Sequence, residues 1–293
     1  AQKAVYLLQT GKCPSPKKIL AICFKKDAAK NLEERVSERC SSELSCRFKS
    51  ITFDSFSKSL VDQFRMGIPK DYRPSENYDI TFLNSDRFNE FCTLTDLQGI
   101  DFTTFSFSRS VSESLFPFPC NQQSIPDYLK KFWSYMYRDK LKTQLTFGMI
   151  NRLAIYILME NEKIKKAIQN TYSHIFLDEF QDITLSQFQF LYSLFYNSNN
   201  QLTAVGDEKQ KIMGFAGAYD KAFDHFCSLF HAVSLELQYN WRSNPELVKI
   251  QDTLVRLLGK ERSFKTISKQ NNNTKNVTVC QIWRFEDEQK EAN

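Results

Sequence analysis

The residues with the clearest chemical potential are two adjacent acids at the end of an apolar run. Residues 175–177, Ile-Phe-Leu, lead directly into Asp178 and Glu179. A short apolar run of this kind is typical of a strand that is buried on both faces of a sheet. Because an unpaired buried carboxylate is very costly, such a strand end requires a compensating cation. A nucleotide-bound magnesium ion would meet that need, with one acid on the metal and the other on an attacking water.

Taken alone, two adjacent acids after an apolar run would form a solvated turn in most proteins. Three further motifs follow the pair along the chain. They are residues 205–210, Val-Gly-Asp-Glu-Lys-Gln, residues 212–218, Ile-Met-Gly-Phe-Ala-Gly-Ala, and residues 237–243, Leu-Gln-Tyr-Asn-Trp-Arg-Ser. In this order and at this spacing, the set closely resembles the motor core of the UvrD/Rep-like superfamily 1 DNA helicases. That family writes these motifs approximately as DEFQD, GD-x-x-Q-x-I-x-x-F/W-x-G-A and N-Y-R-S.

The resemblance implies a nucleotide site for ATP and Mg²⁺. It implies that Asp178 holds the Mg²⁺ and that Glu179 positions or deprotonates the attacking water. It further implies that Gln210 senses the terminal phosphate and that Arg242 is an arginine finger on the transferred phosphate. Trp241 replaces the family tyrosine that stacks on adenine and could keep that role. For Arg242, an ordinary surface salt bridge is the alternative.

The resemblance also implies a path for single-stranded DNA, formed by Phe24, Lys25, Lys26, Phe53 and Phe215. Phe24 and Phe215 match aromatic residues of the family that contact single-stranded DNA, and base stacking on such rings tolerates any sequence. Lys25 and Lys26 replace polar residues of the family and would contact phosphates in a different geometry. A place in the core is the alternative for Phe24.

Several positions depart from the family pattern. Met213 stands where the family usually has tyrosine, and Ala216 stands where it usually has arginine. Both changes leave the glycines of the loop in place, which indicates a variant subfamily and not an inactive site. Asp54 replaces a histidine, and an acid would repel a phosphate backbone, so we expect Asp54 to cap a helix. Asp27 is expected to cap the helix that follows Phe24.

Composition restricts the class of protein. The chain has 293 residues, of which 42% are hydrophobic and 25% charged, as in soluble globular proteins. The formal net charge of +5 permits binding to nucleic acid. No apolar run is long enough for a membrane span, and no secretion leader is evident, so we expect a cytoplasmic protein. The 8 cysteines form no CxxC pair, which argues against a zinc site or a disulfide framework.

The expected fold is α/β: a RecA-like parallel sheet of the P-loop NTPase type, with a helical insertion and the start of a second RecA-like domain. Residues 1–65 and 145–235 would form the first motor domain, residues 66–144 the insertion, and residues 236–293 the truncated second domain. Strands are expected at residues 19–24, 48–53, 201–205 and 277–285. Helices are expected at residues 85–92, 125–142, 184–196 and 245–259, whereas residues 101–119 show no periodicity.

The implied function is that of an ATP-dependent DNA helicase or translocase, moving 3′ to 5′ on single-stranded or partly duplex DNA, in repair or defence. Two alternatives stay open: a DNA- or nucleotide-sensing ATPase that partners a nuclease against phage, and a non-catalytic DNA-binding fragment. The sequence contains no phosphate-binding loop, since Gly11-Lys12 lacks the required flanking residues. We therefore expect these residues to be inactive alone and to belong to a longer protein.

Overall fold

A computed structural model describes residues 1–97, 102–114, 125–139, 141–211, 217–257 and 266–270. The chain divides into two compact units, Ala1–Ala232 and Val233–Asn293. This division lies close to the domain boundary expected after residue 235. Among the described residues, no helix has both the length and the apolar character that crossing a bilayer requires.

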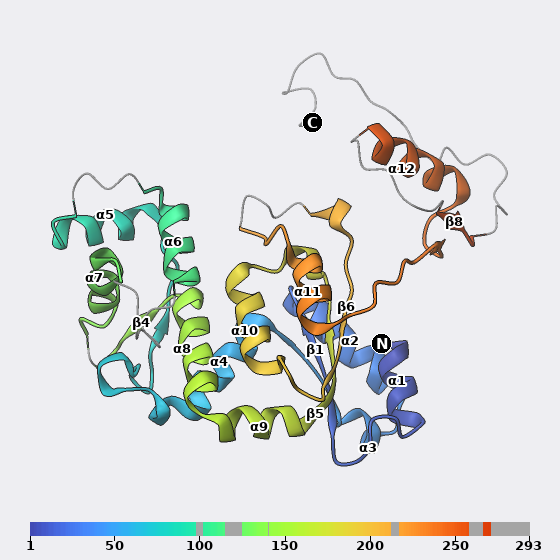
Figure 1. Ribbon diagram of the computed structural model, residues 1–293, viewed down its shortest axis with the longest axis horizontal. Helices are drawn as coiled ribbons and strands as arrows, with labels where there is room; N and C mark the ends of the chain where they lie inside the picture. Colours follow the sequence, from blue (N-terminus) through green and yellow to red (C-terminus); the bar gives the residue numbers. More distant parts are fainter. Residues whose placement is uncertain (98–101, 115–124, 140, 212–216, 258–265, 271–293) are drawn as a thin grey trace. The chain divides into compact units, whose positions relative to one another are not determined.

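A four-stranded parallel sheet forms the centre of the first unit, in the order β2-β1-β5-β6 (Figure 1). The strands are β1 (Lys18–Cys23), β2 (Phe48–Thr52), β5 (Tyr172–Leu177) and β6 (Gln201–Ala204). Five consecutive residues of β1 are buried, because helices cover both faces of the sheet. The mixed α/β architecture with a parallel sheet is therefore confirmed, as are the four strands predicted from the sequence pattern.

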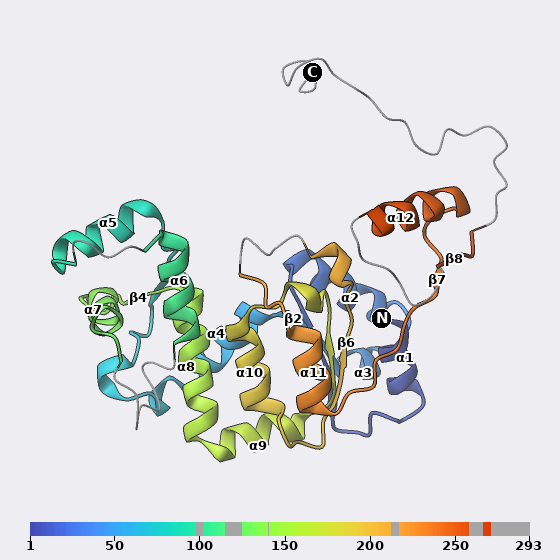
Figure 2. The ribbon, with the colours of Figure 1, turned by 45° about the horizontal axis from the view of Figure 1, so that its top comes forward.

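Helices pack on both faces of the sheet (Figure 2). Ile19 and Ala21 face a cluster formed with α1 (Gln2–Gln9), α2 (Lys26–Ser37) and α3 (Ser42–Ser45). Leu20 and Ile22 face the larger core on the other side. That core is built on α4 (Phe53–Phe64), α8 (Phe147–Glu160), α9 (Glu162–Thr171), α10 (Leu185–Phe195) and α11 (Ala222–Phe230). Alternate residues of one strand thus serve two different helical layers.

A buried polar contact joins three helices of the larger core. Asn151 of α8 is 6% exposed and accepts a hydrogen bond from Ser57 Oγ of α4 at 2.9 Å. Its amide nitrogen donates to the backbone carbonyl of Ser186 in α10 at 2.9 Å. A buried network of this kind stabilises a fold when every member is paired, and removal of one member leaves the others unpaired.

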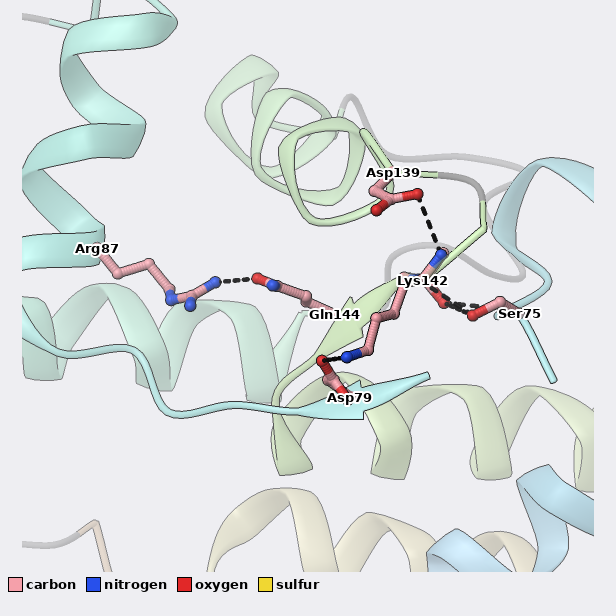
Figure 3. A network of polar contacts seen from close by, with 7 residues as sticks. Ser75, Asp79, Arg87, Asp139, Lys142 and Gln144 are labelled. Carbon is pink, nitrogen blue, oxygen red and sulfur yellow. Dashed lines mark hydrogen bonds and ion pairs between the residues drawn. The ribbon is translucent and has the colours of Figure 1, made fainter. Parts of the chain in front are cut away.

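The described residues between 65 and 145 are mainly helical and include a two-stranded parallel sheet of their own. Their elements are η1 (Arg65–Gly67), η2 (Lys70–Tyr72), β3 (Asp79–Ile80), α5 (Ser85–Leu94), α6 (Thr104–Glu113), α7 (Asp127–Met136) and β4 (Gln144–Leu145). Polar contacts fasten the two strands (Figure 3). Lys142 Nζ lies 3.0 Å from Asp79 Oδ2, and Arg87 of α5 donates to the side chain of Gln144.

One prediction for this region was wrong, and one of its helices was not predicted. The helix expected over residues 125–142 ends at Met136. The segment 101–119, which has no periodicity, contains α6. Thr103 caps α6 by accepting from Ser106 N at 3.1 Å, and Phe107 and Val111 bury one face of it. Tertiary packing of these two residues therefore outweighs the weak helix propensity of a serine-rich segment.

The expected helix caps are also corrected. Lys25 precedes the first turn of α2, and Asp27 lies within that turn. Thr52 caps α4, because its hydroxyl oxygen accepts from Ser55 N at 3.2 Å. Asp54 therefore lies inside the first turn, where its charge still favours the helix dipole. Both α2 and α4 therefore begin earlier than they would if Asp27 and Asp54 were their caps.

Strand β5 ends in a tight left-handed turn. Glu179 has φ of 50° and leads into η3 (Phe180–Asp182). A non-glycine residue in this region strains the backbone by about 1–2 kcal/mol. His231 has nearly the same backbone, with φ of 51°, at the end of α11.

The second unit contains β7 (Tyr239–Asn240), α12 (Pro245–Leu257) and β8 (Ile267–Ser268). The two strands pair in parallel, Tyr239 with Ile267. Asn244 caps α12, accepting from Leu247 N at 2.9 Å. The strand expected at residues 277–285 lies outside the described residues.

Asn151→Ala should lower the free energy of unfolding by about 2–4 kcal/mol, because Ser57 and Ser186 lose their buried partner. Asn89→Ala is the matched control, since Asn89 is an exposed helical asparagine. It should change stability by less than about 0.5 kcal/mol. Urea titration of the purified chain measures both. Equal effects of the two substitutions would show that the buried contact contributes nothing.

His231→Gly should raise the free energy of unfolding by about 1 kcal/mol, since glycine adopts the left-handed backbone without strain. Glu179→Gly should give a smaller gain, because it also removes the carboxylate that accepts from Gln181 Nε2. The comparison uses the same urea titration. A loss of stability in His231→Gly would show that the left-handed backbone is not under the strain described.

Candidate functional site

The carboxyl ends of the four parallel strands meet at one edge of the sheet. Cys23 pairs with Thr52, and Leu177 pairs with both Ile22 and Ala204. The residues that follow these strands therefore lie along the same edge. They include Phe24 after β1, Phe53 after β2, Asp178 and Glu179 after β5, and residues 205–207 after β6.

Asp178 is half-buried directly after β5. Its backbone N–H donates to the carbonyl of Ile22 at 3.0 Å, which continues the pairing of β5 with β1. Burial raises the pKa of the Asp178 carboxyl above its ordinary value, and the neighbouring charge of Glu179 raises it further. A divalent cation at this position would relieve both effects.

A Mg²⁺ ion fits this donor set in one particular way. Among the described residues, no group of three or more His, Cys, Asp or Glu side chains could hold a metal. A closed, all-protein cage is therefore absent from that part of the chain. Mg²⁺ in nucleotide enzymes is instead held by one or two carboxylates together with substrate phosphates. Asp178 suits that arrangement.

Glu179 is exposed, unlike its neighbour. One of its carboxylate oxygens accepts a hydrogen bond from Gln181 Nε2 at 2.7 Å. Phe180, between them, is 1% exposed, and its ring packs on Phe223 and Phe226 of α11 with ring centroids 5.2 and 5.0 Å away. The buried ring anchors the turn that presents the Glu179 carboxylate to solvent.

Gln181 is a site residue that the sequence analysis did not single out. Its side chain is 3% exposed, and Oε1 accepts from the backbone N–H of Asp207 at 3.1 Å. The sequence did contain a signal for it. A glutamine that follows a buried phenylalanine must find hydrogen-bond partners for both ends of its amide. The partner, Asp207, follows β6 and lies 26 residues further along the chain, and spacing alone does not reveal it.

Asp207 connects this contact to Gln210. The Asp207 carboxylate accepts from Lys209 N at 3.1 Å and from Gln210 Nε2 at 3.2 Å. Gln210 is exposed, so its amide is accessible to a ligand. The structure thus brings Asp178, Glu179 and Gln210 to the ends of two neighbouring strands.

Phe215, Met213 and Ala216 lie outside the described residues. Residues 218–219, which come after these positions in the sequence, are fixed to the stretch that follows Glu179. Tyr219 N donates to the carbonyl of Ile183 at 2.7 Å, and Thr184 forms an antiparallel bridge with Ala218.

The other DNA candidates differ in accessibility. Lys25 and Lys26 are exposed after β1, and Phe24 is half-buried. Phe53 is 6% exposed, as a member of the larger core. A base cannot stack on a ring that is covered in this way, so we leave Phe53 out of the DNA path.

Arg242 and Trp241 belong to the second unit. The side-chain oxygen of Asn240 accepts from the backbone N–H groups of Arg242 and Ser243, each at 2.9 Å. This turn precedes α12 and leaves Arg242 exposed and Trp241 67% exposed. No ion pair joins Arg242 to another described residue. Within that part of the chain, the alternative that Arg242 forms an ordinary surface salt bridge has no support.

Comparisons with known proteins agree with this arrangement. The family model for the UvrD/REP helicase N-terminal domain matches residues 1–231. A probable DNA helicase II homolog of Mycoplasma capricolum is 27% identical over 290 residues, covering 94% of this chain and 39% of that protein. A probable DNA helicase II homolog of Rickettsia conorii is 24% identical over 295 residues, covering 94% and 43%.

The ATP-dependent DNA helicase Rep of Escherichia coli is 30% identical over 112 residues, covering 38% of this chain and 16% of that protein. The chain spans about two fifths of the length of the Mycoplasma and Rickettsia relatives. Since the family match extends over residues 1–231 of 293, the chain belongs to the UvrD/REP helicase family.

Proposed function

We propose that the protein carrying this chain is an ATP-dependent DNA helicase or translocase that acts on single-stranded or partly duplex DNA. The observation that carries the proposal is the continuous set of hydrogen bonds from Glu179 through Gln181 and Asp207 to Gln210, beside Asp178. Acidic and amide groups at the ends of two adjacent parallel strands suit a magnesium–nucleotide ligand.

The chemistry assigns one task to each residue. Bound MgATP would supply the phosphoanhydride bond whose hydrolysis drives movement. Asp178 would hold the Mg²⁺, and Glu179 would orient the attacking water and accept its proton. Gln210 would contact the terminal phosphate through its exposed amide. Arg242 would neutralise the developing charge, a task for which a planar guanidinium is well suited.

Single-stranded DNA would contact Phe24, Lys25 and Lys26 at the end of β1 and the loop that carries Phe215. The lysines would contact phosphates, and the aromatic rings would stack on bases. We further propose movement from 3′ to 5′, a role in repair or defence, and a cytoplasmic location.

A second candidate is a DNA-sensing ATPase that partners a nuclease and does not unwind DNA. The departures at Met213 and Ala216 favour it, because they change the loop that would couple DNA to the nucleotide. Strand displacement by the full-length protein separates the two. DNA-stimulated ATP hydrolysis without displacement supports the second candidate.

Glu179→Gln in the full-length protein should leave ATP affinity nearly unchanged and reduce turnover by about 100-fold or more, because the amide cannot accept the proton. Glu208→Gln is the control, since Glu208 is an exposed acid in the short helix η4 (Glu208–Gln210) beside the site. It should retain wild-type turnover. DNA-stimulated phosphate release and binding of a non-hydrolysable ATP analogue measure the two quantities. Undiminished turnover in Glu179→Gln would refute the role assigned to Glu179.

Phe215→Ala should weaken binding to single-stranded DNA by about 5- to 100-fold, as expected for the loss of one stacked base. Nucleotide affinity should stay the same. Phe82→Ala provides the control, because Phe82 is also a large exposed aromatic, at 74% exposure. Fluorescence anisotropy with a labelled oligonucleotide measures the affinity. Equal DNA affinity of Phe215→Ala and wild type would rule out stacking on Phe215.

A further inference from the structure

We propose that Gln181 is a positioning residue that fixes the Glu179 carboxylate by tying it to the backbone of the neighbouring strand's end. The inference rests on the proposed function, in which Glu179 acts on the attacking water. Gln181 itself would touch neither nucleotide nor water. It would act through Glu179 on one side and Asp207 on the other.

The chemistry of the two partners fixes the orientation of the Gln181 amide. The backbone N–H of Asp207 is a donor, so it must meet Oε1. The amide nitrogen then faces the Glu179 carboxylate, which as an anion can only accept. A reversed amide would oppose donor to donor and acceptor to acceptor. Both contacts therefore require one orientation, and each supports the other.

Burial makes this arrangement selective for glutamine. Because Gln181 is 3% exposed, water cannot replace either of its partners at low cost. Gly206 makes room for it, since a Cβ at that position would collide with Gln181 Oε1. The same Cβ would lie 3.0 Å from Phe180 N and from the ring of Phe223. The close approach of the two strand ends thus depends on a glycine opposite the Gln181 amide.

Glu179 needs such a support. Its side chain is exposed, and a free glutamate side chain samples many rotamers. A general base acts efficiently when it is held in position before the reaction begins. The 2.7 Å bond from Gln181 holds one carboxylate oxygen and leaves the other for water.

The hydrogen bonds of Gln181 also link Glu179 to Gln210, and we call this linked set of bonds the tether. Asp207, whose N–H binds Gln181, accepts from Gln210 through its carboxylate. A displacement of Gln210 by a phosphate would therefore reach Glu179 through two side chains and one short stretch of backbone. The residue that senses the phosphate and the residue that activates water would change position together.

Two variants of Gln181 separate positioning from a purely structural role. Gln181→Glu keeps an oxygen for the Asp207 N–H and removes the donor to Glu179. Gln181→Met keeps the length of the side chain and removes both bonds. A purely structural role would leave Gln181→Glu active and impair only Gln181→Met.

In the full-length protein, both variants should lower kcat for DNA-stimulated ATP hydrolysis by about 10- to 100-fold, the effect of losing one hydrogen bond to a charged group. KM for ATP should stay within about threefold of wild type, because Gln181 does not contact the nucleotide. Gln187→Glu is the matched control, since Gln187 Oε1 accepts from Thr184 N at 3.1 Å and glutamate keeps that acceptor. It should leave kcat and KM unchanged.

Hydrogen exchange at the Asp207 amide tests the tether independently of turnover. Exchange should be faster in Gln181→Met and remain slow in Gln181→Glu. Wild-type kcat in Gln181→Glu, or unchanged exchange in Gln181→Met, would overturn the inference. A wild-type protein that hydrolyses no ATP would refute the proposed function instead, while the exchange rates would still decide whether the tether exists. If Gln181→Glu unfolds at the assay temperature, Gln181→Met carries the kinetic test.

Discussion

The parallel pairing of β5 with β6 is the constraint on which the site depends. Leu177 pairs with Ala204, and the hydrogen-bond ladder continues past both strands. Val205 N donates to the carbonyl of Leu177 at 2.8 Å, and Phe180 N donates to the carbonyl of Val205 at 2.9 Å. Because these bonds fix the two strand ends side by side, the polar residues beyond them come within hydrogen-bond distance. The acid pair and Gln210 lie at neighbouring strand ends for this reason.

The rest of the first unit supports this pairing. Helices cover both faces of the sheet, so the strands are held by apolar packing that is independent of any ligand. Against this rigid background the site contains two locally unfavourable features. Asp178 has a raised pKa because it is half-buried, and Glu179 has a strained backbone. Features of this kind persist where the surrounding structure over-determines them, and they cluster at functional sites.

The sequence predicted those parts of the structure that rest on local pattern. Apolar runs located β1, β5 and β6, and the motifs located the residues at their carboxyl ends. The helix expected from residue 245 begins there as α12, with Pro245 in the first position, which suits a proline. Each of these signals lies within a few residues of the element it predicts.

The sequence did not predict what depends on partners far along the chain. Helix α6 exists because Phe107 and Val111 find a core built from other segments. Phe53 matches a family motif, yet the same core covers its ring. Gln181 acquires its importance from Asp207, which follows a different strand, β6. Long-range register decides these three cases, and one-dimensional spacing does not contain it.

We propose that Asp178 and Arg242 serve one nucleotide site in the full-length protein. A crystal structure of the full-length protein with Mn²⁺ and a non-hydrolysable ATP analogue tests it most directly, since Mn²⁺ replaces Mg²⁺ and scatters anomalously. We expect the anomalous peak beside the Asp178 carboxylate, with the Arg242 guanidinium facing the terminal phosphate. A peak away from the carboxyl end of β5, or Arg242 on an outer surface remote from the phosphates, would contradict the claim.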